Sequence, residues 1–147
     1  MGTRGLTVVI KNGKKVVSQY GQWDHYPKGQ GLYILLFLSN ILNIIRLRKA
    51  VENLSYITTE QLNDYRNDIP ETLSRDTGAK ILSLIANGTT QPLYLINKFP
   101  CCEGVFTVDL DKEEFTTKYH GITSTFSFNY LPSEEEYLSS FKVVQCQ

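Results

Sequence analysis

The chain has 147 residues, of which 41% are hydrophobic, and its 15 Lys and Arg residues balance its 15 Asp and Glu residues. This length and composition suffice for one globular domain, residues 1–147, with a hydrophobic core of its own. The balanced charge excludes a global field that would hold a nucleic-acid polymer or an anionic membrane, and it equally excludes an acidic mimic of DNA.

The cysteines and the longest apolar run bear on the compartment. Two of the three cysteines, Cys101 and Cys102, are adjacent, which makes a poor disulfide framework and favours reduced thiols. No basic segment leads into an apolar stretch with a cleavage site, so we expect no secretion. The apolar run Leu32–Leu38 is interrupted at Ser39 and ends before Arg46, whereas a membrane span needs about 20 predominantly apolar residues. We therefore expect a cytoplasmic protein that contacts neither a membrane nor a nucleic-acid polymer.

The first predicted element is a β-hairpin. Residues 6–10 are rich in β-branched side chains, and Asn12 with Gly13 is the preferred two-residue hairpin turn because both tolerate positive φ. The turn predicts four facing pairs: Lys11 with Lys14, Val9 with Val16, Thr7 with Ser18 and Gly5 with Tyr20. This hairpin closes residues 2–5 onto the loop that follows the second strand, so the two segments are expected to form one surface.

A long helix is predicted next. Pro27 and Gly29 end the second strand, and a helix of about six turns follows from Gly31. Its buried stripe is predicted to contain Ile34, Leu38, Ile41 and Ile45, with Leu35 and Leu42 beside it. The first turns are apolar nearly all round, which indicates burial on several sides.

Two shorter helices are predicted from their end signals. Thr58 and Gln61 have the spacing of a capping box, which opens a helix that runs to about Asn67. A second helix fits residues 76–86. Asn87 and Gly88, which follow it, are a good left-handed C-cap.

The last third of the chain is predicted to be rich in β-structure. Strands are predicted at residues 93–96, 105–109, 114–119 and 123–129. Residues 111–113 make the turn between the second and third of these strands, and Ser133 with Glu136 opens a C-terminal helix through a second capping box. An N-terminal β-hairpin, central helices, C-terminal antiparallel strands and a final helix show no βαβ alternation. We therefore expect an α+β fold with a mixed or antiparallel sheet.

Several separated positions carry a resemblance. They are Gly-Thr-Arg-Gly at residues 2–5, Gln-Tyr-Gly-Gln-Trp-Asp at 19–24, Tyr-Pro at 26–27 and Gly-Gln-Gly at 29–31. With these motifs the chain resembles a family of small, mostly uncharacterised proteins from phages, bacteria and fungi. Residues 73–82 and 108–111 are similar to the same family, so the resemblance spans most of the chain.

Two positions depart from the pattern of that family. The family pattern has a small residue such as glycine where this chain has His25, and Trp-Ala after the glutamate of the segment 99–104. No activity comes with the family. The resemblance therefore implies a fold and a phage setting, in which the protein acts in the cytoplasm of the host.

The N-terminal motif is predicted to form a ligand-binding site, because glycines, amides and aromatic side chains are concentrated in it. Its candidate residues are Arg4, Gln19, Tyr20, Gln22, Trp23, Asp24, Tyr26, Gly29 and Gln30. The guanidinium of Arg4 offers a planar fork for a phosphate or carboxylate, or else it binds Asp24 or a carbonyl of the neighbouring strand. Trp23 either stacks on a ring of the ligand or covers the core. The turn at residues 29–31 precedes a helix, and a helix N-terminus attracts anions.

Catalytic and metal chemistry have weaker signals. Asp24 and His25 are the one adjacent pair of acid and imidazole, and they form either a general base or a turn-capping Asp beside an exposed His. His25 and His120 lie far apart, and the adjacent cysteines lack the two-residue spacer of zinc knuckles, so we expect no metal site and no cofactor. Asp109 and Asp111 are suited to a cation, although turn residues are the preferred interpretation.

Three functions are in competition. We expect a non-enzymatic binding protein that sequesters a small anionic or nucleotide-like ligand. The resemblance implies a phage-type accessory role against a host-defence signal. The first alternative is a hydrolase that uses Asp24, or Thr3 as an N-terminal nucleophile after the two residues before it are removed. The second alternative is a homo-oligomeric interaction protein that associates through the Leu32–Leu38 helix.

Overall fold

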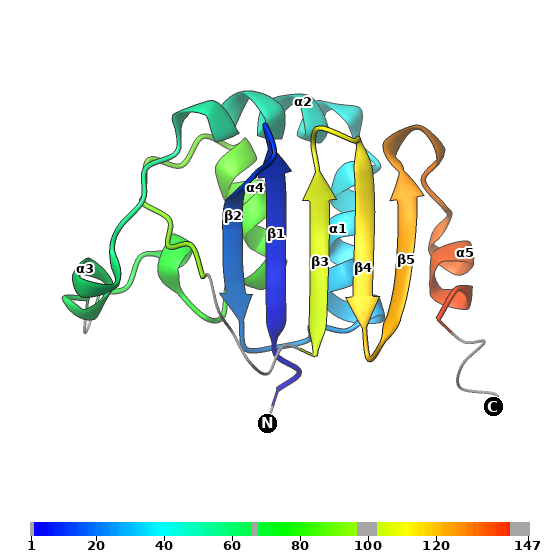
Figure 1. The fold of residues 1–147 in the computed structure, drawn as a ribbon, viewed down its shortest axis with the longest axis horizontal. Helices are drawn as coiled ribbons and strands as arrows, with labels where there is room; N and C mark the ends of the chain where they lie inside the picture. The colour runs from blue at the N-terminus through cyan, green and yellow to red at the C-terminus, as the bar shows by residue number, and fades with distance from the viewer. Residues whose placement is uncertain (1, 66–67, 97–102, 142–147) are drawn as a thin grey trace.

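The fold is built on one mixed β-sheet. The structure is a computed structural model, and it describes residues 2–65, 68–96 and 103–141. Five strands lie in the order β2-β1-β3-β4-β5, as Figure 1 shows. Their bounds are β1 Gly5–Lys11, β2 Lys14–Gly21, β3 Gly104–Asp109, β4 Glu114–Tyr119 and β5 Ile122–Ser127. The helices are α1 Leu32–Leu38, α2 Ile41–Ala50, α3 Thr59–Asn63, α4 Ile81–Ala86 and α5 Glu134–Ser139. The expected α+β class is confirmed.

The sheet is mixed because β1 pairs with two strands of opposite direction. It is antiparallel to β2 and parallel to β3, with Gly5 opposite Gly104 in the parallel pair. The strands from β3 to β5 then form the antiparallel meander that the sequence predicts. The N-terminal hairpin is thereby joined to the C-terminal strands through β1 and β3, which are about a hundred residues apart in the sequence.

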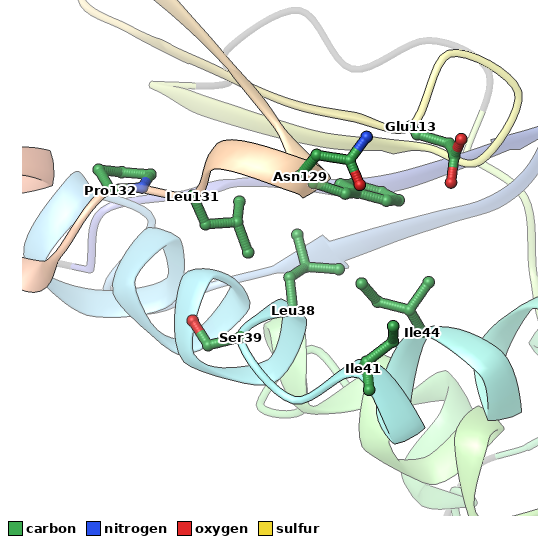
Figure 2. Close-up of a pocket in the computed structure, with 9 residues that line it drawn as sticks. Leu38, Ser39, Ile41, Ile44, Glu113, Asn129, Leu131 and Pro132 are labelled. Carbon is green, nitrogen blue, oxygen red and sulfur yellow. The ribbon is translucent and has the colours of Figure 1, made fainter.

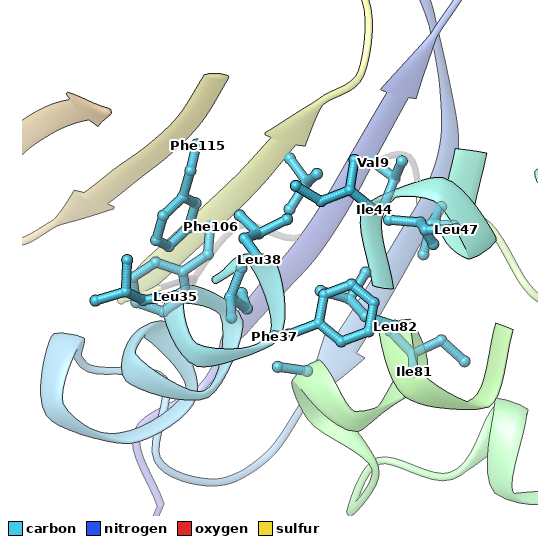
Figure 3. Packing of buried hydrophobic residues seen from close by; sticks show 14 of the residues in the cluster. Val9, Leu35, Phe37, Leu38, Ile44, Leu47, Ile81, Leu82, Phe106 and Phe115 are labelled. Atoms are coloured by element: carbon cyan, nitrogen blue, oxygen red, sulfur yellow. The ribbon is translucent and has the colours of Figure 1, made fainter. Parts of the chain in front are cut away.

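The core lies between one face of the sheet and the helices. Figure 3 shows Val9, Phe106 and Phe115 of the sheet facing Leu35 and Leu38 of α1 and Leu82 of α4. All of these side chains are buried. Tyr137 of α5 is also fully buried, and its hydroxyl donates to the carbonyl of Pro27 at 2.9 Å. The final helix is therefore anchored to the turn that precedes α1.

The hairpin turn is confirmed, but the predicted register is wrong beyond it. Asn12 and Gly13 both have positive φ, as the turn requires. A bulge between Val9 and Ile10 then shifts the pairing by one residue, so Val9 faces Val17 and Gly5 faces Gly21. A two-residue turn fixes the pairing of the two strands only up to the first irregularity. A bulge adds one unpaired residue to one strand, so every pair beyond it is shifted.

The predicted six-turn helix is two helices. An irregular turn, Pro27–Gly31, leads into α1, which ends at Leu38, and α2 starts after a break. Asn40 makes this break because its backbone is extended and its side chain accepts the N–H of Leu42 at 3.0 Å, as an N-cap does. The two helical segments meet at 92°, and no single helix among the described residues is long and apolar enough to cross a membrane.

The break overturns the predicted buried stripe. Ile41 is 69% exposed and Ile45 is 56% exposed, whereas Ile44 and Leu47 of the same helix are buried. The 92° bend rotates the apolar face, so the periodicity that is correct for α1 does not continue into α2.

The remaining elements follow their end signals in part. Both capping boxes are present, at Thr58 with Gln61 and at Ser133 with Glu136. Helix α3 ends at Asn63, and the predicted end at Asn67 lies outside the described residues. The predicted helix 76–86 starts as a 3-10 turn, Gly78–Lys80, and becomes α4. The predicted strand 93–96 is wrong, since the segment forms a single bridge between Leu93 and Tyr56.

Replacing Gly13 with Val tests the turn. A Cβ at Gly13 meets nothing within 4 Å, so any loss of stability comes from its φ of +73°, which a β-branched residue resists. We expect the free energy of unfolding to fall by about 1–3 kcal/mol in urea denaturation. Lys14→Val, one residue further on in the strand, is the control and should change it by less than about 0.5 kcal/mol. Equal effects of the two substitutions would contradict the assigned turn.

A pair of aspartate substitutions tests the break between α1 and α2. Ile41→Asp should leave the protein folded, because this side chain is 69% exposed. Ile44→Asp should unfold it, because the carboxylate would enter the core without a partner at a cost of several kcal/mol. Circular dichroism melting of both variants makes the comparison, and a continuous helix predicts unfolding in both cases.

Candidate functional site

The centre of the N-terminal motif is the buried imidazole of His25. It lies at the ends of three neighbouring strands, each of which contributes one glycine: Gly5, Gly21 and Gly104. A Cβ on Gly21 would lie 2.1 Å from the ring, and one on Gly104 would lie 2.1 Å from the carbonyl of His25. The expectation of an exposed His25 is therefore wrong, because the glycines leave a notch that the ring fills completely.

The hydrogen bonding of His25 defines its chemistry. Its Nδ1 lies 3.1 Å from the carbonyl of Trp23, and a carbonyl only accepts, so Nδ1 carries the proton. Nε2 is then a bare acceptor, and it has no hydrogen-bond partner among the described residues. Burial lowers the pKa of His25 to about 4, against smaller opposing effects of that hydrogen bond and of Asp24. The ring is neutral at pH 7 and is packed against Phe106 at a centroid distance of 6.1 Å.

The loop that contains Trp23 is tied to residues 73–82. The indole N–H of Trp23 donates to the Asp76 carboxylate at 2.7 Å. The backbone N–H of Gln22 donates to the carbonyl of Arg75 at 2.9 Å. Two segments that carry the family resemblance therefore lie together, although the sequence separates them by about fifty residues.

Gln30 makes a second link between the same two segments. Its side-chain oxygen accepts the N–H of Ala79 at 2.8 Å, and its side-chain nitrogen donates to the carbonyl of Trp23 at 3.2 Å. Gly78 has a φ of +52°, and a Cβ there would lie 2.9 Å from the Gln30 amide. Both ends of this amide are thus used inside the protein.

The turn before α1 uses its own backbone donors. Asp24 has a positive φ, and its carbonyl accepts the N–H of Gln30 at 2.8 Å. The carbonyl of Tyr26 accepts the N–H groups of Gly29 at 3.0 Å and of Gly31 at 3.4 Å. The donors that were expected to attract an anion at this turn are therefore engaged in closing it.

Arg4 holds the start of the chain to β3 through its backbone. Its N–H donates to the Glu103 carboxylate at 3.2 Å, and its carbonyl accepts the N–H of Glu103 at 2.9 Å. The carbonyl of Thr3 accepts the N–H of His25 at 3.0 Å. The glycine-rich opening is therefore an ordered part of the sheet end.

A small pocket lies beside the contact between the loop after β2 and residues 75–76. It has a volume of about 140 Å³ and is lined by Gln19, Tyr20, Leu62, Leu73, Arg75, Tyr94 and Ile96. Gln19 and Tyr20 are thus the predicted site residues that line it. Arg75 and Tyr94 were missed by the sequence analysis. Arg75 lies within residues 73–82, to which the sequence analysis assigned a predicted resemblance but no role at the site, and nothing in the sequence singled out Tyr94.

The remaining predicted site residues lie at the start of the chain and in the segment between β2 and α1, and they do not line this pocket. They are Arg4, Gln22, Trp23, Asp24, Tyr26, Gly29 and Gln30. Trp23 is 44% exposed, so its ring is open to solvent on one side. Polar groups of Gln22, Trp23 and Gln30 make hydrogen bonds within the protein. These residues therefore support the segment that contains Arg75.

The aspartates near the hairpin accept hydrogen bonds from the backbone of two turns. The Asp111 carboxylate accepts the N–H groups of Asn12 at 2.8 Å and of Gly13 at 2.7 Å, which lowers its pKa. Asp109 accepts the N–H groups of Asp111 and Lys112. Within the described residues no group of three or more His, Cys, Asp or Glu side chains is placed to hold a metal ion.

Comparison of the chain with protein-family models, curated proteins and solved structures finds no match. The resemblance to the phage, bacterial and fungal family stays a prediction. Any function must therefore be argued from the contacts described above.

The buried imidazole predicts a defined pH dependence of stability. The unfolded chain takes up a proton on His25 below about pH 6.5, whereas the native protein does so near pH 4. Stability from this group is complete above pH 6.5 and is lost as the pH falls toward 4. We expect the wild type to lose about 3 kcal/mol more than His25→Asn between pH 7 and pH 4.

Urea denaturation at several pH values measures this difference. The Asn variant keeps a donor for the Trp23 carbonyl but does not titrate, so carboxylate effects common to both proteins cancel. Parallel stability curves for the two proteins would contradict the burial of a neutral His25.

Proposed function

We propose that this protein is a non-enzymatic binding protein for a small anion that carries a ring, held in the pocket beside the N-terminal motif. The observation that carries the proposal is that the cationic side chain of Arg75 lines a pocket together with two tyrosines. Among the residues that the structure describes, none with an acidic side chain lines this pocket. The ligand class is the small anionic or nucleotide-like ligand that the sequence favours.

The charge of Arg75 is available to a ligand. Two side-chain ion pairs are found among the described residues, Arg48 with Glu113 and Lys80 with Glu71, and neither involves Arg75. The residue is exposed. A guanidinium presents a planar fork that matches a phosphate or a carboxylate, and it keeps its charge at any physiological pH.

The two tyrosines supply apolar surface for a ring. The hydroxyl of Tyr20 donates to the side chain of Gln22 at 2.6 Å, and the hydroxyl of Tyr94 lies 2.8 Å from that of Thr59. With their hydroxyls bound, the rings are held in place as walls. A volume of about 140 Å³ admits one aromatic ring, since an engineered cavity of about 150 Å³ holds benzene. The acidic group of such a ligand would therefore remain at the mouth, beside Arg75.

In this proposal, the N-terminal motif holds Arg75 in position. Gln22 binds the Arg75 carbonyl, Trp23 binds Asp76, and Gln19 donates to the carbonyl of Ser74 at 3.3 Å. Three consecutive residues, Ser74, Arg75 and Asp76, are thus fixed from the hairpin side, and Arg75 among them lines the pocket. A wall held before the ligand arrives loses less entropy on binding.

The alternatives have less support from the geometry. A hydrolase would need a nucleophile or base at the pocket, but neither Asp24 nor Thr3 lines it. Association through the Leu32–Leu38 helix would use a face whose main apolar residues, Ile34, Leu35, Phe37 and Leu38, are buried in the core of the same chain. Sequestration of a host signal in a phage setting is the biological role that the family resemblance adds to this proposal.

Substitution of Arg75 tests the site. The probes are phenyl phosphate and the four ribonucleoside 5′-monophosphates, with binding measured by calorimetry. Arg75→Gln should weaken the binding of the best probe at least tenfold, because a charge-assisted hydrogen bond contributes about 1.5–3 kcal/mol. Its melting temperature should stay close to that of the wild type, since the Arg75 contact to Gln22 uses the backbone.

Lys80→Gln is the matched control, because it removes a cation from the same segment outside the pocket. This exposed pair with Glu71 contributes little to stability. Equal binding by wild type and Arg75→Gln, or equal losses in both variants, would contradict the assignment of the site.

A further inference from the structure

Helix α2 exposes an apolar patch at the edge of the molecule. Ile41, Leu42 and Ile45 are 69%, 52% and 56% exposed. Their spacing places them side by side on one face of the helix, and we call them the α2 patch. Figure 1 shows α2 along the upper edge of the sheet, with no other helix or strand beyond it. Large aliphatic side chains grouped in this way mark a contact with a protein or a membrane.

The patch continues into a groove with both apolar and polar walls. Figure 2 shows this groove between the break of the two helices and the segment that follows β5. Its volume is about 350 Å³, and its apolar lining includes Leu38, Ile41, Ile44, Phe128 and Leu131. Its polar lining is Ser39, Asn129 and Glu113, and the Glu113 carboxylate is paired with Arg48. The apolar surface offered by this end of the molecule is therefore deeper than the three side chains of the patch.

The other end of α2 is cationic. Residues 32–51 contain Arg46, Arg48 and Lys49 and no acidic residue. Arg48 is bound to the carbonyl of Leu110 and pairs with Glu113. Arg46 and Lys49 line a second pocket of about 500 Å³. Within the described part of the chain, neither makes an ion pair and no acidic side chain lines this pocket.

We infer that α2 docks on an anionic membrane surface, with the α2 patch among the acyl chains and Arg46 and Lys49 at the headgroups. A helix that lies in the membrane interface needs this combination of large apolar side chains and basic residues. Arg46 lies four residues after Leu42 and Lys49 four residues after Ile45, and all four are exposed, so the cations lie on the same side of the helix as the patch. The peripheral position of α2 leaves the sheet clear of the bilayer (Figure 1).

A second copy of the chain fits this surface less well. Three aliphatic side chains offer a few hundred Å² of apolar area, whereas a stable dimer buries about 800 Å² on each partner. A twofold contact across α2 would also bring Arg46 and Lys49 of both copies together, with no acid on the helix to pair them. Anionic headgroups neutralise the same cations.

The inference differs from the sequence-based expectation of no membrane contact. That expectation rests on the balanced charge of the whole chain and on the lack of a spanning segment. Attraction to a surface depends on charges within about a Debye length, so an unpaired local group of cations acts where the net charge is zero. The pocket at Arg75 takes no part in this contact.

Flotation with lipid vesicles tests the inference. The wild-type protein should bind vesicles of phosphatidylglycerol and phosphatidylcholine, mixed one to two, at least tenfold more strongly than vesicles of phosphatidylcholine alone. Ile45→Asp should reduce this binding at least tenfold, because it places a carboxylate in the patch. Ile69→Asp is the control, since Ile69 is 51% exposed and does not belong to the patch.

Arg46→Gln and Lys49→Gln separate the charge contribution from the apolar one. Each should weaken binding to the anionic vesicles about fivefold and leave any binding to neutral vesicles unchanged. Circular dichroism melting confirms that every variant is folded. No preference for anionic vesicles, or equal binding by wild type and Ile45→Asp, would overturn the inference. It would also be overturned by a concentration-dependent dimer that Ile45→Asp dissociates, which would assign the patch to a second copy.

Discussion

The structure depends on the close approach of one imidazole to three strand ends. Gly5 and Gly21 lie against the side chain of His25, and Gly104 lies against its carbonyl. The backbones of β1, β2 and β3 therefore approach His25 more closely than any residue with a Cβ at these positions would allow. The ring then fixes the direction of the loop that leaves β2, and that loop binds residues 75 and 76 through Gln22 and Trp23. Both the joining of the N-terminal hairpin to β3 and the wall of the proposed pocket follow from this single packing arrangement.

Burial of His25 costs free energy, and the cost is smaller because the buried imidazole is neutral. An unpartnered buried nitrogen costs about 1–3 kcal/mol, and a charged ring would cost more. Packing of the ring against Phe106 and the filled notch offset this cost. In this chain the imidazole therefore acts as a space-filling group, and its low pKa is a consequence of that role.

Sequence signals predicted what is decided locally. The turn at Asn12 and Gly13 and both capping boxes depend on residues within four positions of each other, and all are present. The hairpin register was wrong for a local reason, since the turn residues carry no signal for the bulge at Val9 and Ile10. The burial of His25 and the wall at Arg75 depend on segments far apart in the chain. Gln19 and Tyr20 of the candidate pocket could therefore be predicted from the sequence. The other lining residues, which lie between residues 62 and 96, could not, because the tertiary fold decides which of them reach the hairpin.

The exposed isoleucines of α2 have a structural origin in the length of the sheet. Strands of six to eight residues span about 20–26 Å, whereas a straight helix over residues 32–50 would span about 28 Å and would overhang the sheet. The break at Asn40 turns α2 across the edge, where Ile44 and Leu47 close the end of the core. Only one face of a helix at an edge contacts the core, so Ile41 and Ile45 are left outside by the same turn that buries their neighbours. Closure of the core needs apolar residues on the inner face alone. The apolar outer face lies next to Arg46 and Lys49, which make no ion pair with the residues that the structure describes. It is therefore better explained by the surface on which we infer that α2 docks than by the fold itself.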